Sequence, residues 1–323
     1  MEILKKKGRT FEINNSNKKL KTPFFFPAIS TVKTNENFID YLKFLSKVGY
    51  PGFLISAYDI YHSKESLKIK EIINSTFQNT FIMIDSGYYE AFWKGDKNWS
   101  FDKMIEAIKD IEADFFFSYD VFWDDKKTIK KQISDIIANT AKTAGAQLRG
   151  ETIPIVHANL KHIEVAIKGV IEGIMPRIIS IPERELGKGI LERAKNIKNI
   201  RREIDRIDKN ILLHLLGTGN PASILIYSLC GADLFDALEW CKNAADPESA
   251  HLYHFIQLEF VKDQYAKSKL KGIPYAYKVM SHNLIFYEKF LQEIQKHMES
   301  GETDKLVKKY LPPYIVPKLK KII

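Results

Sequence analysis

Three aspartates stand where short apolar and aromatic runs end. Asp85 ends FIMID, Asp120 ends FFFSYD, and Asp236 lies in DLFDALEW. Runs of this kind are typical of buried parallel strands. Side chains at the carboxyl ends of parallel strands converge on the edge where α/β enzymes carry out their chemistry. We therefore expect the three carboxylates to share one site, with two reacting groups and one that recognises substrate.

Two carboxylates that face one carbon are a usual means of cleaving a bond to a sugar. One attacks the anomeric carbon and forms a covalent glycosyl-enzyme, while the other transfers a proton. A third carboxylate can accept hydrogen bonds from the N–H groups of the leaving base. Aromatic side chains close to the aspartates in the chain would stack on a flat ring. These aromatic residues are Tyr88, Tyr89, Phe122, Trp123 and Trp240.

Each aspartate also has an ordinary structural explanation. Asp85 precedes Ser-Gly and could cap a helix or shape a turn. Asp120 could cap a loop, and Asp236 could pair with a lysine at a barrel rim. Such roles are the more common ones for a single aspartate, but three carboxylates at three strand ends favour a catalytic site.

The elements that must position these residues alternate between strands and helices. Eight strands are expected, at Phe24–Ile29, Phe53–Ala57, Phe81–Asp85, Phe115–Asp120, Ile153–His157, Arg177–Ile181, Ile211–Leu216 and Asp233–Ala237. Helical periodicity between them covers Asp102–Ile111, Lys126–Ala144, Leu160–Gly173, Leu186–Ile207 and Pro221–Cys230. The eight units occupy roughly 230 residues, close to the usual size of an eight-stranded α/β barrel.

The predicted fold is therefore α/β, a (β/α)8 TIM-type barrel over about residues 22–245. A short N-terminal β extension precedes it, a helical and aromatic part follows over about 246–323, and residues 1–323 are expected to form a single domain. A doubly wound open sheet is the competing architecture. It would need a G-x-G-x-x-G turn after an early strand, which this sequence lacks. The late Gly217-Thr218-Gly219 is typical of a tight turn with Pro221 at a helix start, and the corresponding loop of a barrel often holds phosphate.

Composition indicates a globular protein with a possible polyanionic partner. The chain has 45% hydrophobic and 28% charged residues and a net charge of +9. No apolar run approaches the ~20 residues of a membrane span, and no secretion signal is recognisable, so a cytoplasmic location without membrane contact is expected. The two cysteines exclude a disulfide framework and a four-cysteine zinc site. A lysine-rich solubilising surface would explain the charge, but its clustering favours nucleic acid, with clusters at Lys5–Arg9, Lys18–Lys21, Arg193–Arg206 and Lys305–Lys321.

An ordered series of motifs resembles the tRNA-guanine transglycosylase superfamily, whose members are α/β barrels that exchange guanine in nucleic acid for a 7-deazaguanine. Thr22–Pro27 looks like the opening strand of that family. The further matching segments are Asp85-Ser86-Gly87-Tyr88-Tyr89 (family D-S-G-G-[FY]), Phe117–Asp120 (F-D-E-C, matched at its aspartate), Leu215–Gly219 (L-M-G-V-G), Asp233–Asp236 (D-M-F-D) and Ser281–Leu284 (late H-N-L). The resemblance spans nearly the whole chain in the family's order.

The resemblance implies a role for each residue of the site. Asp236 would be the nucleophile, Asp85 the general acid and base, and Asp120 the reader of the guanine edge. Tyr89 would stack on the base. The remaining residues implied in base binding are Ser86, Gly87, His157, Leu215, Leu216 and Gly217.

Several departures from the family pattern are as informative as the matches. Three closely spaced cysteines that bind zinc in the family are missing before His282, which excludes the usual zinc site. An improvised site from His251, His254 and His282 is a weaker alternative than ordinary helix histidines. The tRNA-gripping P-T-R-x-x-R stretch is replaced by Ala237–Lys242.

Two further segments differ from the tRNA enzymes. His157 replaces a base-reading glutamine, and Ile181–Gly187 (IPERELG) replaces the G-G-L-x-V-G loop. IPERELG and F-D-x-L-E-W-C are similar to the 7-deazaguanine DNA transglycosylase branch. That branch implies exchange of guanine in DNA for a 7-deazaguanine such as preQ0, without a metal, ATP or a redox cofactor.

This reaction implies base flipping and contacts to DNA phosphates. The candidate phosphate-binding residues are Lys242, Arg193, Lys195, Arg201 and Arg202. A partner ATPase that opens the duplex and a homodimer are both compatible with the sequence. The alternatives are a tRNA-directed enzyme, a non-catalytic subunit of such an enzyme, and an unrelated barrel glycosidase or decarboxylase.

Overall fold

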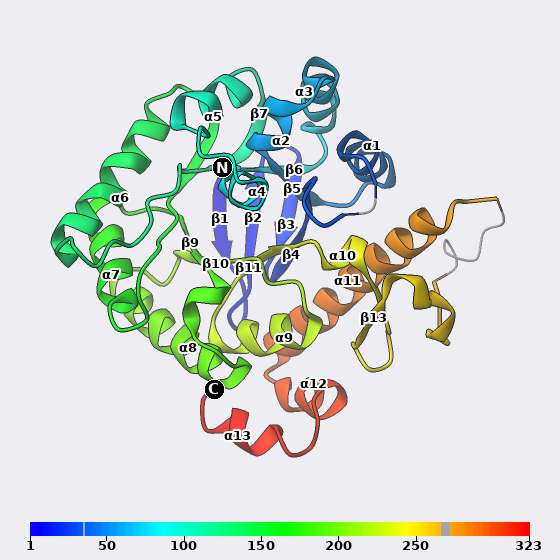
Figure 1. Ribbon diagram of the computed structural model, residues 1–323. Coiled ribbons are helices and arrows are strands. Elements are labelled where there is room, and N and C mark those ends of the chain that lie inside the picture. The colour runs from blue at the N-terminus through cyan, green and yellow to red at the C-terminus, as the bar shows by residue number, and fades with distance from the viewer. Residues whose placement is uncertain (35, 266–271) are drawn as a thin grey trace.

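Eight parallel strands form a barrel in the computed structural model, which describes residues 1–34, 36–265 and 272–323 (Figure 1). The strands are β4 (Phe24–Ile29), β5 (Gly52–Ser56), β6 (Phe81–Asp85), β7 (Glu112–Phe117), β8 (Arg149–Ile153), β9 (Ile178–Pro182), β10 (Leu212–Leu216) and β11 (Leu234–Ala237). They lie in the order β8-β7-β6-β5-β4-β11-β10-β9. The ring closes just after β8, where Val156 N donates to Ser180 O at 2.8 Å and Ser180 N donates to Pro154 O at 3.0 Å. The predicted (β/α)8 TIM-type barrel is confirmed.

Helices surround the barrel because each carries one apolar face (Figure 1). They are α1 (Phe38–Val48), α2 (Ala57–His62), α3 (Ser66–Thr76), α4 (Tyr88–Lys94), α5 (Phe101–Ile108), α6 (Ile129–Ala144), α7 (Ile163–Ile174), the 3-10 helix η1 (Glu183–Leu186), α8 (Ile190–Ile207), α9 (Pro221–Cys230) and α10 (Glu239–Lys242). Side-chain caps fix several starts. Ser100 accepts from Lys103 N at the start of α5, and Asn220 accepts from Ala222 N before α9.

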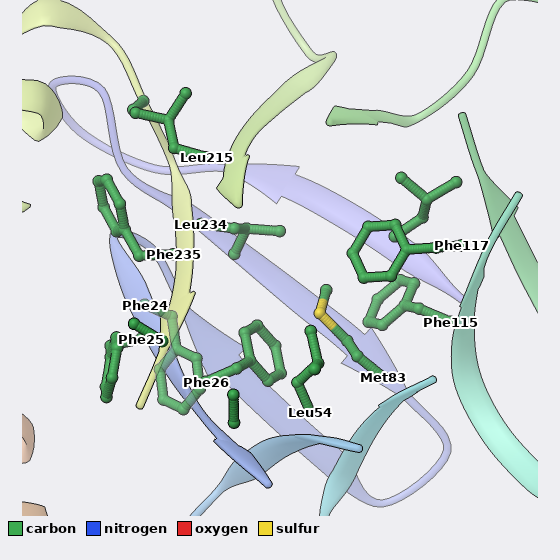
Figure 2. Close-up of a cluster of buried hydrophobic side chains, with 14 of the residues drawn as sticks. Phe24, Phe25, Phe26, Leu54, Met83, Phe115, Phe117, Leu215, Leu234 and Phe235 are labelled. Atoms are coloured by element: carbon green, nitrogen blue, oxygen red, sulfur yellow. The ribbon is translucent and has the colours of Figure 1, made fainter. Parts of the chain in front are cut away.

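Alternation along each strand decides which side chains point into the barrel. Figure 2 shows Met83 and Leu234 pointing into the interior, whereas Leu215 points away from it. Because successive side chains of a strand face opposite ways, residues two positions apart share a face. Asp85 and Asp236 each follow an interior residue by two positions, so both carboxylates emerge inside the carboxyl end of the barrel.

The N-terminal β extension closes the opposite end of the barrel. It consists of the antiparallel strands β1 (Glu2–Lys5), β2 (Phe11–Asn15) and β3 (Lys18–Lys21). Lys18 Nζ lies 2.7 Å from the carboxylate of Asp114, near the start of β7, and Arg9 pairs with Asp233, immediately before β11. These contacts lie at the amino ends of the barrel strands, which leaves the carboxyl ends open to ligands.

The C-terminal region packs against the barrel, mainly through a long helix. Its elements are β12 (Asn243–Ala245), β13 (Leu252–His254), the 3-10 helix η2 (Phe255–Phe260), α11 (Tyr275–Ser300), α12 (Thr303–Tyr310) and α13 (Val316–Lys320). The predicted C-terminal helices are present as α11, α12 and α13, whereas Leu252–His254, which was expected to be helical, forms strand β13 and pairs with β12. In the described part of the chain, no helix combines the length and apolar character needed to cross a membrane.

Candidate active site

A cavity of about 540 Å³ opens at the carboxyl ends of the barrel strands. Asp85, Asp120 and Asp236 all line it, as the sequence analysis expected. Ligand pockets commonly occupy this end of a barrel and have volumes in this range. Three strand ends that are far apart in the sequence therefore bring their carboxylates to one cavity.

Asp236 sits on β11 and is only 7% exposed. Gly217 N donates to its Oδ1 at 3.4 Å. His214 Nε2 lies 3.1 Å from the same oxygen, close but not aligned as a hydrogen bond. The other ring nitrogen of His214 lies 3.1 Å from the Ser180 hydroxyl. The carboxylate thus contacts β10 and the turn after it on one side and lines the cavity on the other.

Asp85 is held at the end of β6 by a turn that needs glycine. Gly87 N donates to Asp85 Oδ2 at 3.0 Å. Gly87 has φ +82°, and a Cβ there would lie 2.5 Å from Tyr58 N. Burial, followed by the charges of Glu90 and Asp120, raises the pKa of Asp85 well above its usual range. Asp85 is therefore suited to hold a proton that it can give to a leaving group.

Asp120 lies three residues beyond the end of β7, because this strand spans Glu112–Phe117 and not the predicted Phe115–Asp120. Its two oxygens have different partners. The Ser86 hydroxyl donates to Oδ2, and His157 Nε2 lies 2.9 Å from Oδ1. The preceding Tyr119 donates its hydroxyl to Trp99 O at 2.9 Å, which fixes the loop that carries the carboxylate.

His157 bridges two carboxylates. Its Nδ1 lies 2.7 Å from Glu185 Oε1, opposite the Nε2 contact to Asp120. Burial lowers the pKa of His157, but the hydrogen bonds that its ring donates to Asp120 and Glu185 outweigh this effect and raise the pKa to about 9. At neutral pH the ring is an imidazolium that donates on both sides. The sequence analysis singled out His157 but not the role of Glu185.

Glu90 is a cavity carboxyl that the sequence analysis missed. It is 3% exposed, and the hydroxyls of Ser30 and Ser56 donate to its two oxygens at 2.6 and 2.7 Å. Burial and then the charge of Asp59 raise the pKa of Glu90 to about 7. Glu90 directly follows Tyr89 in the chain. Only the structure shows that Glu90 lies on the buried side of α4 and lines the cavity.

The other residues expected to bind the base divide into two groups. Tyr89, Leu216 and Ser86 line the cavity. Leu215 points away from it, because it alternates with the interior residues of β10 (Figure 2). Gly87 acts through its backbone on Asp85. The prediction was that backbone groups of Leu215–Gly217 complete the pocket; Leu216 and Gly217 line the cavity, and Leu215 is not among its lining residues.

The predicted phosphate-binding residues also fall into different environments. Lys242 lines the cavity, and Lys195 and Arg202 are exposed on α8. Arg193 is half-buried and pairs with Glu183 at 2.8 Å.

Arg201 does not have the exposed position that a phosphate contact requires. It is 3% exposed, and its guanidinium donates to Ile211 O at 2.8 Å and pairs with Asp205 at 2.7 Å. Its place on the apolar face of α8, four residues after Ile197 and three before Ile204, is the reason. This prediction is corrected.

Two of the three histidines considered for an improvised zinc site, His254 and His282, have ordinary structural roles. His282 is buried, its Nε2 lies 2.6 Å from Ala245 O, and its Nδ1 accepts from Tyr265 N at 3.2 Å. His254 Nδ1 accepts from Ile256 N at the start of η2. Within residues 1–34, 36–265 and 272–323, no three His, Cys, Asp or Glu side chains are grouped to hold a metal ion. The donor set therefore does not fit the zinc ion of the resembling family.

Comparison with known proteins gives two relatives of low identity. No family model matches the chain. It is 24% identical over 295 residues to a tRNA-guanine(15) transglycosylase of Nanoarchaeum equitans (strain Kin4-M). The alignment covers 86% of this chain and 68% of the relative. It is 23% identical over 317 residues to a tRNA-guanine(15) transglycosylase of Sulfolobus acidocaldarius. This alignment covers 91% of the chain and 62% of that relative. These similarities support a relationship to the tRNA-guanine transglycosylase superfamily, and they do not distinguish its DNA-directed branch.

Proposed function

We propose that the protein is a base-exchange transglycosylase, a pentosyltransferase that replaces guanine in DNA with a 7-deazaguanine such as preQ0. The observation that carries the proposal is the convergence of Asp85, Asp120 and Asp236 on one cavity lined by aromatic rings. A nucleophile, a proton carrier and a base reader are the three functions that such an exchange needs. The target nucleotide has to leave the helix to reach a cavity at the barrel end.

In the first half-reaction, Asp236 attacks C1′ of the target nucleotide. The carboxylate oxygen forms a bond to C1′ while the bond from C1′ to N9 of guanine breaks. The departing base takes the proton of Asp85, whose pKa is raised by burial and by the neighbouring carboxylates, which favours its protonated form. The products are free guanine, ionised Asp85 and a covalent glycosyl-enzyme.

In the second half-reaction, the incoming 7-deazaguanine reverses these steps. Asp85 accepts the proton of its N9–H, and N9 attacks C1′ and releases Asp236. One glycosidic bond is broken and one is formed, so neither ATP nor a redox cofactor is required. The same cavity has to accept guanine and its deaza analogue in turn.

Recognition of the base falls to the residues at the back of the cavity. Asp120 would accept hydrogen bonds from N1–H and the exocyclic amine of guanine. The imidazolium of His157 holds Asp120 in place and balances its charge. Tyr89, which lines the cavity and is 38% exposed, would stack on the ring.

Two departures from the tRNA enzymes support DNA as the substrate. Ala237–Lys242 takes the place of the tRNA-gripping stretch and forms one wall of the cavity, to which it contributes the acidic Glu239. IPERELG supplies η1 and the His157 partner Glu185. The second candidate is exchange in tRNA, which the printed names of both relatives favour. A non-catalytic subunit is the less favoured alternative, because all three carboxylates are present.

A base-release assay separates these candidates. The protein is incubated with DNA or tRNA that carries radiolabelled guanine, with and without preQ0, and released label is measured. The proposal expects release from DNA that exceeds one equivalent per enzyme only when preQ0 is present and that is absent in Asp236→Asn. Asp110→Asn, an exposed carboxylate outside the cavity, is the matched control. Release from tRNA alone would assign the tRNA reaction, and no release from either would contradict the proposal.

The form of the DNA tests the need for a partner. Duplex and single-stranded versions of the same labelled DNA are compared in that assay. Release from single strands but not from duplex would indicate that a partner ATPase opens the duplex. Equal release from both would show that the protein flips the base unaided.

A further inference from the structure

Helix α4 presents three aromatic side chains to solvent. Tyr89, Phe92 and Trp93 are 38%, 62% and 49% exposed. Their spacing of three and four residues places them on one side of the helix, while Glu90 and Ala91 face the interior. A helix that packs on a barrel normally buries its apolar side and exposes polar residues. We call these three residues the aromatic face.

The aromatic face continues outward from the cavity. Tyr89 and Phe92 line the cavity, and the Trp93 ring centroid lies 6.3 Å from that of Tyr89 and 5.7 Å from that of Phe92. The three rings therefore form a connected surface from the proposed base site to the outside. A nucleotide next to the flipped one in the strand would leave the cavity along this surface.

Basic side chains accompany the aromatic rings. Lys33 Nζ lies 3.4 Å from the Trp93 ring centroid, a cation–π contact at an exposed site. Arg184 and Lys242 line the same cavity as Tyr89 and Phe92. Aromatic rings interleaved with cations are the usual arrangement for binding a single strand, where bases stack and phosphates meet positive charge. A protein partner would not explain why the surface runs into the cavity.

We propose that the aromatic face binds the unpaired nucleotides that flank the target base, with their bases stacked on Phe92 and Trp93. This inference rests on the proposed function, since it extends the path of the strand that enters the cavity. It implies that the protein selects single-stranded or locally opened nucleic acid over closed duplex. Because every base has a π-face, the contact would tolerate different neighbouring sequences.

Fluorescence anisotropy of dye-labelled oligonucleotides tests the inference without any chemistry. A single-stranded DNA with one guanine, its RNA counterpart and the DNA duplex are titrated with protein in the absence of 7-deazaguanine. The variants are Phe92→Ala and Trp93→Ala, with Phe92→Tyr and Trp93→Phe as replacements that keep a ring. Phe260→Ala is the matched control, because Phe260 is 67% exposed and lies on η2, outside the cavity.

Each alanine variant is expected to weaken single-strand binding by about tenfold, the scale of one lost base–aromatic stack. The ring-retaining variants should stay close to wild type, and Phe260→Ala should not change the affinity. The effect on duplex should be much smaller. Unchanged single-strand affinity, or an equal loss for duplex, would overturn the inference. An effect limited to DNA or to RNA identifies which strand the face accepts.

The result is separable from the base-exchange assay. If the wild type exchanges bases and Phe92→Ala and Trp93→Ala bind single strands normally, the binding role of the aromatic face is refuted and the proposed function stands. If these variants lose single-strand binding but the wild type shows no exchange, the binding role of the aromatic face is supported and the proposed function is refuted. Quenching of tryptophan emission by the bound strand, lost in Trp93→Phe, would place the stacked base on Trp93.

Discussion

His214 lies beside the proposed nucleophile, with its Nε2 3.1 Å from Oδ1 of Asp236. The imidazole is fully buried on the neighbouring strand β10 and stacks on Phe117 at 5.3 Å between ring centroids. The Ser180 hydroxyl lies 3.1 Å from the other ring nitrogen of His214, Nδ1. This chain of contacts fixes the orientation of the ring and therefore limits the rotation of the Asp236 carboxylate toward the cavity.

Replacement of His214 by phenylalanine tests this positioning role. The stack on Phe117 can be kept, while the contact to Asp236 is lost. We expect kcat to fall about ten- to hundredfold because the nucleophile is less well aligned, with little change in the KM for the incoming base. Steady-state kinetics separate the two constants. An unchanged kcat with a normal thermal transition would contradict the role of His214.

The imidazolium of His157 makes the stability of the protein depend on pH. Because the folded-state pKa of about 9 lies above the ordinary value, its contribution is fully present below about pH 6.5 and disappears as pH rises through about 9. The difference between the folded-state pKa and the ordinary pKa of histidine corresponds to a contribution of order 3 kcal/mol to the free energy of unfolding. Urea unfolding at pH 6 and pH 9.5 should show this loss in wild type and a smaller one in His157→Gln. Parallel pH curves for the two proteins would refute it.

Glu90 is expected to regulate the proton on Asp85. Its charge is one of the causes that raise the pKa of Asp85, and the variant Glu90→Gln removes it. The pKa of Asp85 should then fall, so the alkaline limb of kcat/KM for base release should move to lower pH. The pH–rate profiles of wild type and variant measure the shift. The control is Glu106→Gln on α5, outside the cavity, and an alkaline limb that stays in place would exclude a coupling of the two carboxyls.

Gly87 and Gly95 provide a matched pair of substitutions. Both have left-handed backbone, with φ +82° and +67°, but only a Cβ at Gly87 meets other atoms, with Tyr58 N at 2.5 Å. Gly95→Ala should cost about 1–2 kcal/mol of unfolding free energy from backbone strain alone. Gly87→Ala should cost clearly more and should also displace Asp85. Chemical unfolding and activity measure both effects, and equal losses in the two variants would show that the close approach to Tyr58 is unimportant.

The barrel could be predicted from the sequence because most of its strands are apolar on both faces, whereas β8 (RGETI) is not and was expected four residues later, at Ile153–His157. Continuous runs such as Phe24–Ile29 and Phe81–Asp85 match β4 and β6 residue by residue. The carboxylates at the strand ends were found for the same reason. Arg201 was misassigned because charge clustering was given more weight than helical spacing, which places it on the buried face of α8.

The rest of the site depends on contacts between distant segments. His214 looks like an ordinary member of an apolar run, and only the barrel shows that it faces Asp236. Glu185 reaches His157 across 28 positions of sequence, and Glu90 meets Ser30 across 60. Local patterns carry no information on such pairs, so the polar groups that tune the three aspartates had to come from the structure.

The most direct test of the account is to look for the covalent intermediate on Asp236. Wild-type protein is mixed with guanine-containing DNA without any 7-deazaguanine, quenched with denaturant, and analysed by denaturing gel and intact mass. A covalent protein–DNA species is expected in wild type and in Asp110→Asn. It should be absent in Asp236→Asn and should disappear when preQ0 is added. A wild-type protein that exchanges bases without this species, or an Asp236→Asn variant that still forms it, would contradict the account.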